Sequence, residues 1–281
     1  MREENKYPIE SDRRRFVKGV VGSAAIGGLG STGVAAVETA TPPTGTSGGL
    51  TEFMGINLVS GPAPRGMPQI PIEIEDDGRL LGVWPETHEE EIEGQTVLRA
   101  EEEIGGVTYS AEWFQYCGVQ TSPALDPKEE RNNEFRSAET TQHEWQQEDL
   151  EGGESLTLDI FEDYEECENE IGSGGLGKPA LATWRSEDLS EGEGLTVQLI
   201  RSPLIEEAAG DDEWLAASTA EGILTYLNVC THFCCLPGYK TNPTSVRVGG
   251  EDGAYCVCHQ SVYDPFTITQ QRFAASPRPD E

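Results

Sequence analysis

The chain has 281 residues, with 51 Asp and Glu against 19 Lys and Arg, and a formal net charge of -32 at pH 7. This charge excludes a nucleic-acid binder, because contacts to phosphate backbones need basic patches. The acidic residues are spread through most of the chain after residue 70, which indicates adaptation to high salt, where charge repulsion is screened within about 3 Å at 1 M. With 36% hydrophobic residues the chain can bury a core for one or two compact domains.

The amino terminus carries a targeting pattern. Residues 11–18 read SDRRRFVK, and the next nineteen residues, 19–37, contain no charge. The pair Arg13 and Arg14, followed by Phe16 and Lys18, resembles a twin-arginine export signal, whose substrates commonly acquire a cofactor before crossing the membrane. As a helix the uncharged run would span roughly 28 Å, so residues 1–37 are either a membrane anchor or a cleaved signal. Both alternatives put the folded part outside the cytoplasm, where disulfides persist.

Residues 38–49 are rich in Pro, Thr, Gly and Ser, and we expect them to form a flexible linker. The following region, 50–179, is an acidic extension with short β-type runs. We expect strands in three of its segments, at 55–59, 70–75 and 106–119. The stretch 126–155 is polar and favours loop or exposed helix.

The last region, 180–281, is predicted to be a mainly β domain. Its first part, LATWRSEDLSEGEGLTVQLI from residue 181, indicates a strand, an acidic turn and a second strand that ends before a charged loop. A third strand is expected at 222–229, GILTYLNV, and it leads directly to Cys230.

Two short boxes hold most of the cysteine and histidine of the chain. They read CTHFCC at 230–235 and CVCHQS at 256–261, and together they contain five of the seven cysteines and two of the four histidines. Disulfides alone would not explain the histidines. A Cys2His2 zinc site would use the same ligand types, but it usually groups its two cysteines and its two histidines separately. Here each box has the mixed spacing, C-x-H in the first and C-x-x-H in the second.

This arrangement resembles the Rieske iron-sulfur family, whose boxes are C-T-H-x-G-C and C-x-C-H-x-S. The resemblance covers about residues 180–279. It implies an antiparallel β-sandwich with a cluster-binding subdomain, and a 2Fe-2S cluster. Cys230 and Cys256 would hold one iron as thiolates, and His232 and His259 the other as imidazoles. Exchanging two thiolates for neutral imidazoles raises the potential to about -150 to +300 mV, against about -400 mV for plant-type ferredoxins.

Further residues of the boxes indicate a respiratory member of the family. By the resemblance, Cys235 and Cys258 form a disulfide between the two loops. Ser261 would donate a hydrogen bond to a bridging sulfide and Tyr263 to a ligand sulfur, which pushes the potential up. The segment AASPRP at 274–279 is similar to the proline-rich loop that covers the cluster.

The sequence departs from the family pattern at two usual glycines, which are Cys234 and Gln260 here. If the backbone at Cys234 needs a positive φ, a side chain there is strained. Cys117 and Cys167 are the remaining cysteines, and we expect a disulfide between them. His88 and His143 lie in polar surroundings, and we expect both on the surface.

The resemblance implies an electron-transfer subunit of a quinol oxidoreductase complex in the cell membrane of a halophilic archaeon. One of His232 and His259 would contact a quinol held by a b-type cytochrome subunit, taking up a proton while the cluster takes an electron. A mobile head on the linker would then pass the electron to a cytochrome or blue-copper acceptor. Two alternatives remain: the small subunit of an exported molybdenum oxidase such as arsenite oxidase, and a structural zinc module.

Overall fold

The computed structural model describes residues 49–92, 95–190 and 192–278. The expected export signal or anchor at 1–37, and the linker except its last residue, lie outside these ranges. Among the residues that are described, no helix is both long and apolar enough to cross a membrane.

The described chain is mainly β, as expected, and its strands pair antiparallel. The strands are β1 (Leu50–Ser60), β2 (Met67–Pro68), β3 (Ile72–Ile74), β4 (Leu80–Gly82), β5 (Thr87–Ile92), β6 (Gln95–Ile104), β7 (Val107–Ser110), β8 (Phe135–Ser137), β9 (Lys178–Trp184), β10 (Leu195–Arg201), β11 (Ile223–Leu227), β12 (Gly238–Tyr239), β13 (Ala254–Cys256) and β14 (Ser261–Ala274). The α-helices are α2 (Glu144–Asp149), α3 (Pro203–Ala209) and α4 (Glu213–Ser218). Short 3-10 helices are η2 (Ala111–Phe114), η3 (Val119–Thr121), η4 (Pro123–Leu125), η5 (Leu158–Phe161) and η6 (Pro243–Val248).

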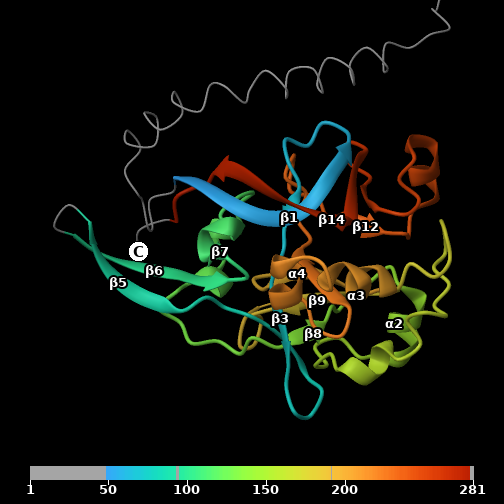
Figure 1. The fold of residues 1–281 in the computed structure, drawn as a ribbon, viewed down its shortest axis with the longest axis horizontal. Coiled ribbons are helices and arrows are strands. Elements are labelled where there is room, and N and C mark those ends of the chain that lie inside the picture. The colour runs from blue at the N-terminus through green and yellow to red at the C-terminus, as the bar shows by residue number, and fades with distance from the viewer. Residues whose placement is uncertain (1–48, 93–94, 191, 279–281) are drawn as a thin grey trace, which may run out of the picture. The chain divides into compact units, whose positions relative to one another are not determined.

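One sheet joins the two ends of the described chain. Its order is β12-β13-β14-β1-β2, and the long strands β1 and β14 pair from Leu50 opposite Ala274 to Ser60 opposite Val262, with two register shifts between. The blue and red arrows of Figure 1 run side by side there. The region before residue 180 thus supplies strands to the sheet that ends the chain, and the expected boundary at 179/180 does not divide the sheets.

A second sheet has the order β11-β10-β9-β8. The strands expected around 181–200 and at 222–229 are its members β9, β10 and β11. All five residues of β11, ILTYL, are buried, as expected for an apolar, β-branched run covered on both faces. The two sheets meet where the Ile70 amide donates to Thr225 O at 3.0 Å and Gln69 bridges to Tyr226. Two smaller sheets, β3-β4 and β5-β6-β7, complete the fold.

Two helices occupy the place where we expected a charged loop. Ser202 caps α3 by accepting from the Leu204 amide, with Pro203 in the first turn, and Asp212 caps α4 by accepting from the Leu215 amide. Trp214 of α4 donates from Nε1 to Gln69 Oε1 at 2.7 Å, which holds α4 against the residue that follows β2. We expected a loop because the segment contains many charged residues, although Ser202 and Asp212 are capping residues.

The polar stretch 126–155 also differs from expectation, because much of its polarity is buried. It contains β8 and α2, and Gln146 of α2 is 1% exposed and donates to Leu181 O at 2.7 Å. His143 is buried rather than exposed, against Gln198 of β10 at 3.4 Å, and burial lowers its pKa from 6.5 to about 4. His88 is half exposed, in accordance with the expectation.

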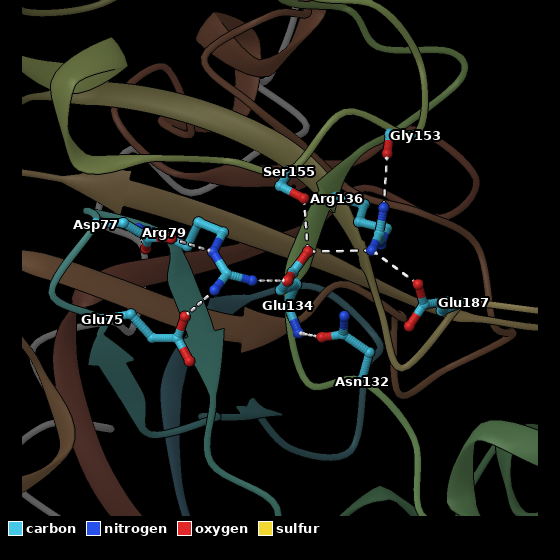
Figure 2. A network of polar contacts seen from close by, with 9 residues as sticks. All are labelled: Glu75, Asp77, Arg79, Asn132, Glu134, Arg136, Gly153, Ser155 and Glu187. Atoms are coloured by element: carbon cyan, nitrogen blue, oxygen red, sulfur yellow. Dashed lines mark hydrogen bonds and ion pairs between the residues drawn. The ribbon is translucent and has the colours of Figure 1, made fainter.

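A charged network fastens the β3-β4 hairpin to the β8 segment (Figure 2). Its centre is the buried Glu134, which accepts from Ser155 Oγ at 2.6 Å and from Arg136 Nη2 at 3.1 Å and also pairs with Arg79. Burial alone would raise the pKa of Glu134, but these hydrogen bonds outweigh it and hold the pKa below its usual value. The network is therefore structural: each charge that it buries has a partner.

Candidate metal centre

The first Cys/His loop, Cys230–Cys235, follows β11 of the second sheet and leads to β12 of the first sheet. The Cys234 amide donates to Cys230 O at 3.0 Å, and the Cys230 amide donates to Cys235 O at 2.8 Å. Cys234 closes this turn with φ 63°. The position where the family has glycine thus adopts the left-handed backbone that glycine tolerates best.

The second Cys/His loop, Cys256–Ser261, is the tight connection between β13 and β14, and its end residues pair with each other. The Gln260 amide donates to Cys256 O at 2.8 Å, and Gln260 also has φ 63°. The two loops therefore repeat one turn, with the left-handed residue four positions after the first cysteine.

A disulfide between Cys235 and Cys258 joins the two loops, with Cα atoms 6.6 Å apart, as the resemblance implied. The expected pair of Cys117 and Cys167 is wrong. Cys117 is bonded to Cys234, Cα to Cα 5.3 Å, and Cys167 is free within the described chain. The reason is a contact that sequence spacing does not reveal: Tyr116 donates to Val229 O at 2.8 Å, which brings Cys117 beside the first loop.

The four expected ligand residues form two pairs, one of cysteines and one of histidines, on the two joined loops. Cys230 and Cys256 are free, 1% and 0% exposed, and hydrogen-bonded to each other. That hydrogen bond lowers the pKa of Cys230 and raises the pKa of Cys256. The rings of His232 and His259 stand with their centroids 4.7 Å apart.

Donors converge on the two sulfurs. The amides of His232 and Phe233 point to the Cys230 sulfur, and those of Cys258 and His259 to the Cys256 sulfur. The Tyr263 hydroxyl lies 3.1 Å from Cys230 Sγ. Burial and the Cys230 sulfur raise the pKa of Tyr263, so its hydroxyl keeps its proton and can donate to a thiolate at Cys230.

An unsatisfied atom tests whether these residues fit a metal centre. His232 Nδ1 is buried and has no hydrogen-bond partner among the described residues. A buried ring nitrogen without a partner costs free energy unless something binds it. Two free buried sulfurs, this nitrogen and the neighbouring His259 ring are the ligand types that a cluster with mixed Cys and His ligation needs. The residues therefore fit the group that the resemblance implies.

Ser261 is buried under a proline-containing segment that the sequence analysis did not assign. Residues 61–66, GPAPRG, lie on the loops: the Ala63 amide donates to Ser261 Oγ at 3.2 Å, and Thr231 Oγ1 donates to Arg65 O at 2.7 Å. The segment comes so close that a Cβ on Gly61, which has φ 103°, would stand 2.5 Å from Ser261 Cα.

Residues 274–278, the described part of the segment 274–279, lie against another segment of the extension. The Ser276 amide donates to Gln115 O at 2.7 Å, and Arg278 pairs with Asp126 at 3.1 Å, so hydrogen bonds hold this end against residues 115–126. Residues 61–66 also have a proline-containing pattern, with two prolines between glycines, that suits a covering loop. They lie in the extension, where we expected no part of the site.

The outer side of the centre is apolar and open. His259 is exposed, whereas His232 is half-buried. Phe233 is 64% exposed, and its ring centroid lies 4.3 Å from that of His232 and 5.0 Å from that of His259. Leu236 and Val257 are also exposed beside these residues in sequence.

Comparison with known proteins gave no match: no protein-family model, no curated protein and no solved structure is significantly similar to this chain.

Proposed function

We propose that this chain binds a Rieske-type 2Fe-2S cluster and transfers electrons from quinol in a membrane respiratory complex. The observation that carries the proposal is the convergence of two free, buried cysteines and two histidines, with His232 Nδ1 buried and unpartnered. When bound, the cluster supplies a one-electron acceptor of raised potential.

The chain's own residues have separate roles in this proposal. Cys230 and Cys256 would hold one iron as thiolates, in accordance with the lowered pKa of Cys230 and the backbone amides that point at both sulfurs. His232 and His259 would hold the other iron. Because donated hydrogen bonds favour the more negative reduced state, Tyr263 and Ser261 would raise the potential.

Exposure selects between the two histidines. His259 is the exposed ring, so we assign it the contact to quinol: its outer nitrogen would accept a hydrogen bond from the quinol hydroxyl and then its proton. The exposed apolar side chains around it, with Phe233 foremost, suit a quinol site in a b-type cytochrome subunit. Two disulfides support a location on the extracytoplasmic face of the cell membrane.

The test is electron paramagnetic resonance of the dithionite-reduced protein, together with metal analysis. We expect two irons per chain and a signal with average g near 1.9, the value of this cluster type. Cys256→Ser should abolish the signal, whereas Cys167→Ser, which changes a free cysteine outside the loops, should retain it. Stoichiometric zinc in a colourless protein would overturn the proposal. Purification of the native complex with a b-type cytochrome tests the proposed partner.

A further inference from the structure

Arg65 is a half-buried cation beside the candidate metal centre. Its guanidinium carbon lies 3.8 Å from the centroid of Phe273 and 4.9 Å from that of Tyr116. Its Nε is buried without a hydrogen-bond partner, and no carboxylate of the described residues forms an ion pair with it. Aromatic faces are therefore its only close electrostatic partners in this part of the chain.

The charge of Arg65 has neither a carboxylate nor a hydrogen-bond partner among the described residues. Arg136 pairs with Glu134 at 3.1 Å and Arg278 with Asp126 at 3.1 Å. Arg185 and Arg201 also lie over aromatic rings without an ion pair in the described chain, but both donate to backbone carbonyls. Burial lowers the pKa of Arg65, which means that its charge loses hydration in the fold.

Three contacts place Arg65 next to Cys230. Its carbonyl accepts from Thr231, the neighbour of Cys230, at 2.7 Å. Tyr116, under the guanidinium, donates to Val229 O, on the other side of Cys230. The charge of Arg65 also interacts electrostatically with Tyr263, whose hydroxyl is 3.1 Å from Cys230 Sγ. The Arg65 segment and the aromatic ring under its guanidinium therefore contact the residues on both sides of Cys230.

We propose that Arg65 sets the reduction potential of the centre, stabilising by its charge the extra negative charge that the cluster gains on reduction. The inference rests on the proposed function. Reduction adds one electron from quinol and no ligand change, so a fixed positive charge nearby favours the reduced form. Since the charge is half-buried, high salt screens it less than a surface charge. Arg65 is not a ligand, and it acts through space and through Tyr263.

The test is a redox titration of the holoprotein in molar salt. The electron paramagnetic resonance signal measures the fraction of cluster that is reduced at each potential. Arg65→Gln should lower the equilibrium constant for reduction about tenfold, which is about 59 mV for one electron. Arg65→Met, which keeps the apolar contacts with Phe273 and Tyr116, should show the same shift. Arg65→Lys should retain most of the potential, because it keeps the charge. Arg272→Gln, an equal charge change on an exposed arginine of β14, should leave the potential unchanged.

The outcomes separate the inference from the proposed function. A normal signal with an unchanged potential in Arg65→Gln and Arg65→Met would overturn the inference and leave the cluster in place. Equal shifts in Arg65→Lys and Arg65→Gln would also overturn it, because they would mean a structural effect. If the unchanged protein gives no such signal, the proposed function itself fails.

Discussion

The two Cys/His loops share one backbone turn, but different forces hold them in place. The second loop lies between directly paired strands, and the Cys256–Ser261 pair of the ladder closes it. The first loop connects β11 of one sheet with β12 of the other, so no strand pairing closes it. It is fastened by two disulfides instead, from the adjacent residues Cys234 and Cys235.

This difference explains how both loops tolerate a side chain at the left-handed position. In the first loop Cys234 adopts the unfavourable left-handed backbone, but its side chain forms a covalent bond to Cys117. In the second loop Gln260 has the same φ, is exposed, and gains no such bond. The same substitution, to glycine, should therefore act in opposite directions at the two positions.

The largest effect is expected for Cys234→Gly. The lost disulfide closes 117 residues, and loop-closure entropy alone assigns such a crosslink roughly 5 kcal/mol. Relief of the left-handed backbone offsets about 1 kcal/mol of this, so the free energy of unfolding should fall by about 4 kcal/mol. Denaturant unfolding under non-reducing conditions, in molar salt, measures it.

The control for Cys234→Gly is the pair of variants Cys117→Ser/Cys234→Gly and Cys117→Ser/Cys234→Ser. Both lack the disulfide and leave no thiol of that pair. The glycine variant should be the more stable of the two by about 1 kcal/mol, since relief of strain should exceed the added entropy of the unfolded chain. A free energy of unfolding unchanged by Cys234→Gly would mean that the crosslink does not hold the first loop.

Acid should weaken the sheet from which the first loop leaves. His143 is buried against Gln198 of β10, and its pKa is lowered from 6.5 to about 4 by burial. The unfolded chain therefore binds a proton at this residue between pH 6.5 and 4 that the folded chain does not bind. Stability should fall over this window by about 3 kcal/mol and show no effect of His143 above pH 7.

His143→Gln tests this contribution, because glutamine keeps a polar partner for Gln198 but does not titrate. The difference in free energy of unfolding between the unchanged chain and the variant should change with pH only between about 6.5 and 4. His88→Gln, at a half-exposed histidine, is the matched control for the substitution itself. A difference for His143→Gln that does not depend on pH would contradict the prediction.

Local patterns were enough to predict the strands that precede the first loop. Apolar, β-branched runs gave β9, β10 and β11, whose residues are buried as such runs require. The helices α3 and α4 were missed because their charged surfaces dominate the composition, although Ser202-Pro203 and Asp212 are capping residues. His143 was misplaced for a similar reason: polar neighbours in sequence do not reveal a buried polar network.

Within the site, the short-range features could be predicted and the long-range ones could not. The disulfide between Cys235 and Cys258 was predicted from the resemblance of the two boxes to those of the Rieske family. The bond from Cys117 to Cys234 and the cover by residues 61–66 depend on β1 pairing with β14 and on Tyr116 reaching Val229. Those contacts join segments more than a hundred residues apart, and no local pattern encodes them.

The smallest predicted effect is the one that isolates the shared turn. Gln260→Gly removes a side chain from a left-handed residue that is exposed, with no partner in the described chain to lose. Relief of strain should exceed the added entropy of the unfolded chain and raise the free energy of unfolding by about 1 kcal/mol.

Gln260→Ala keeps a Cβ at the same position and should give no gain, so it is the control for Gln260→Gly. If both loops are one turn held by different means, the gain from Gln260→Gly should equal the difference between glycine and serine at position 234 once Cys117 is serine. Denaturant unfolding of the four variants in one buffer compares the two values. A loss of stability in Gln260→Gly would instead mean that the second loop depends on its side chain, and the equivalence of the two turns would fail.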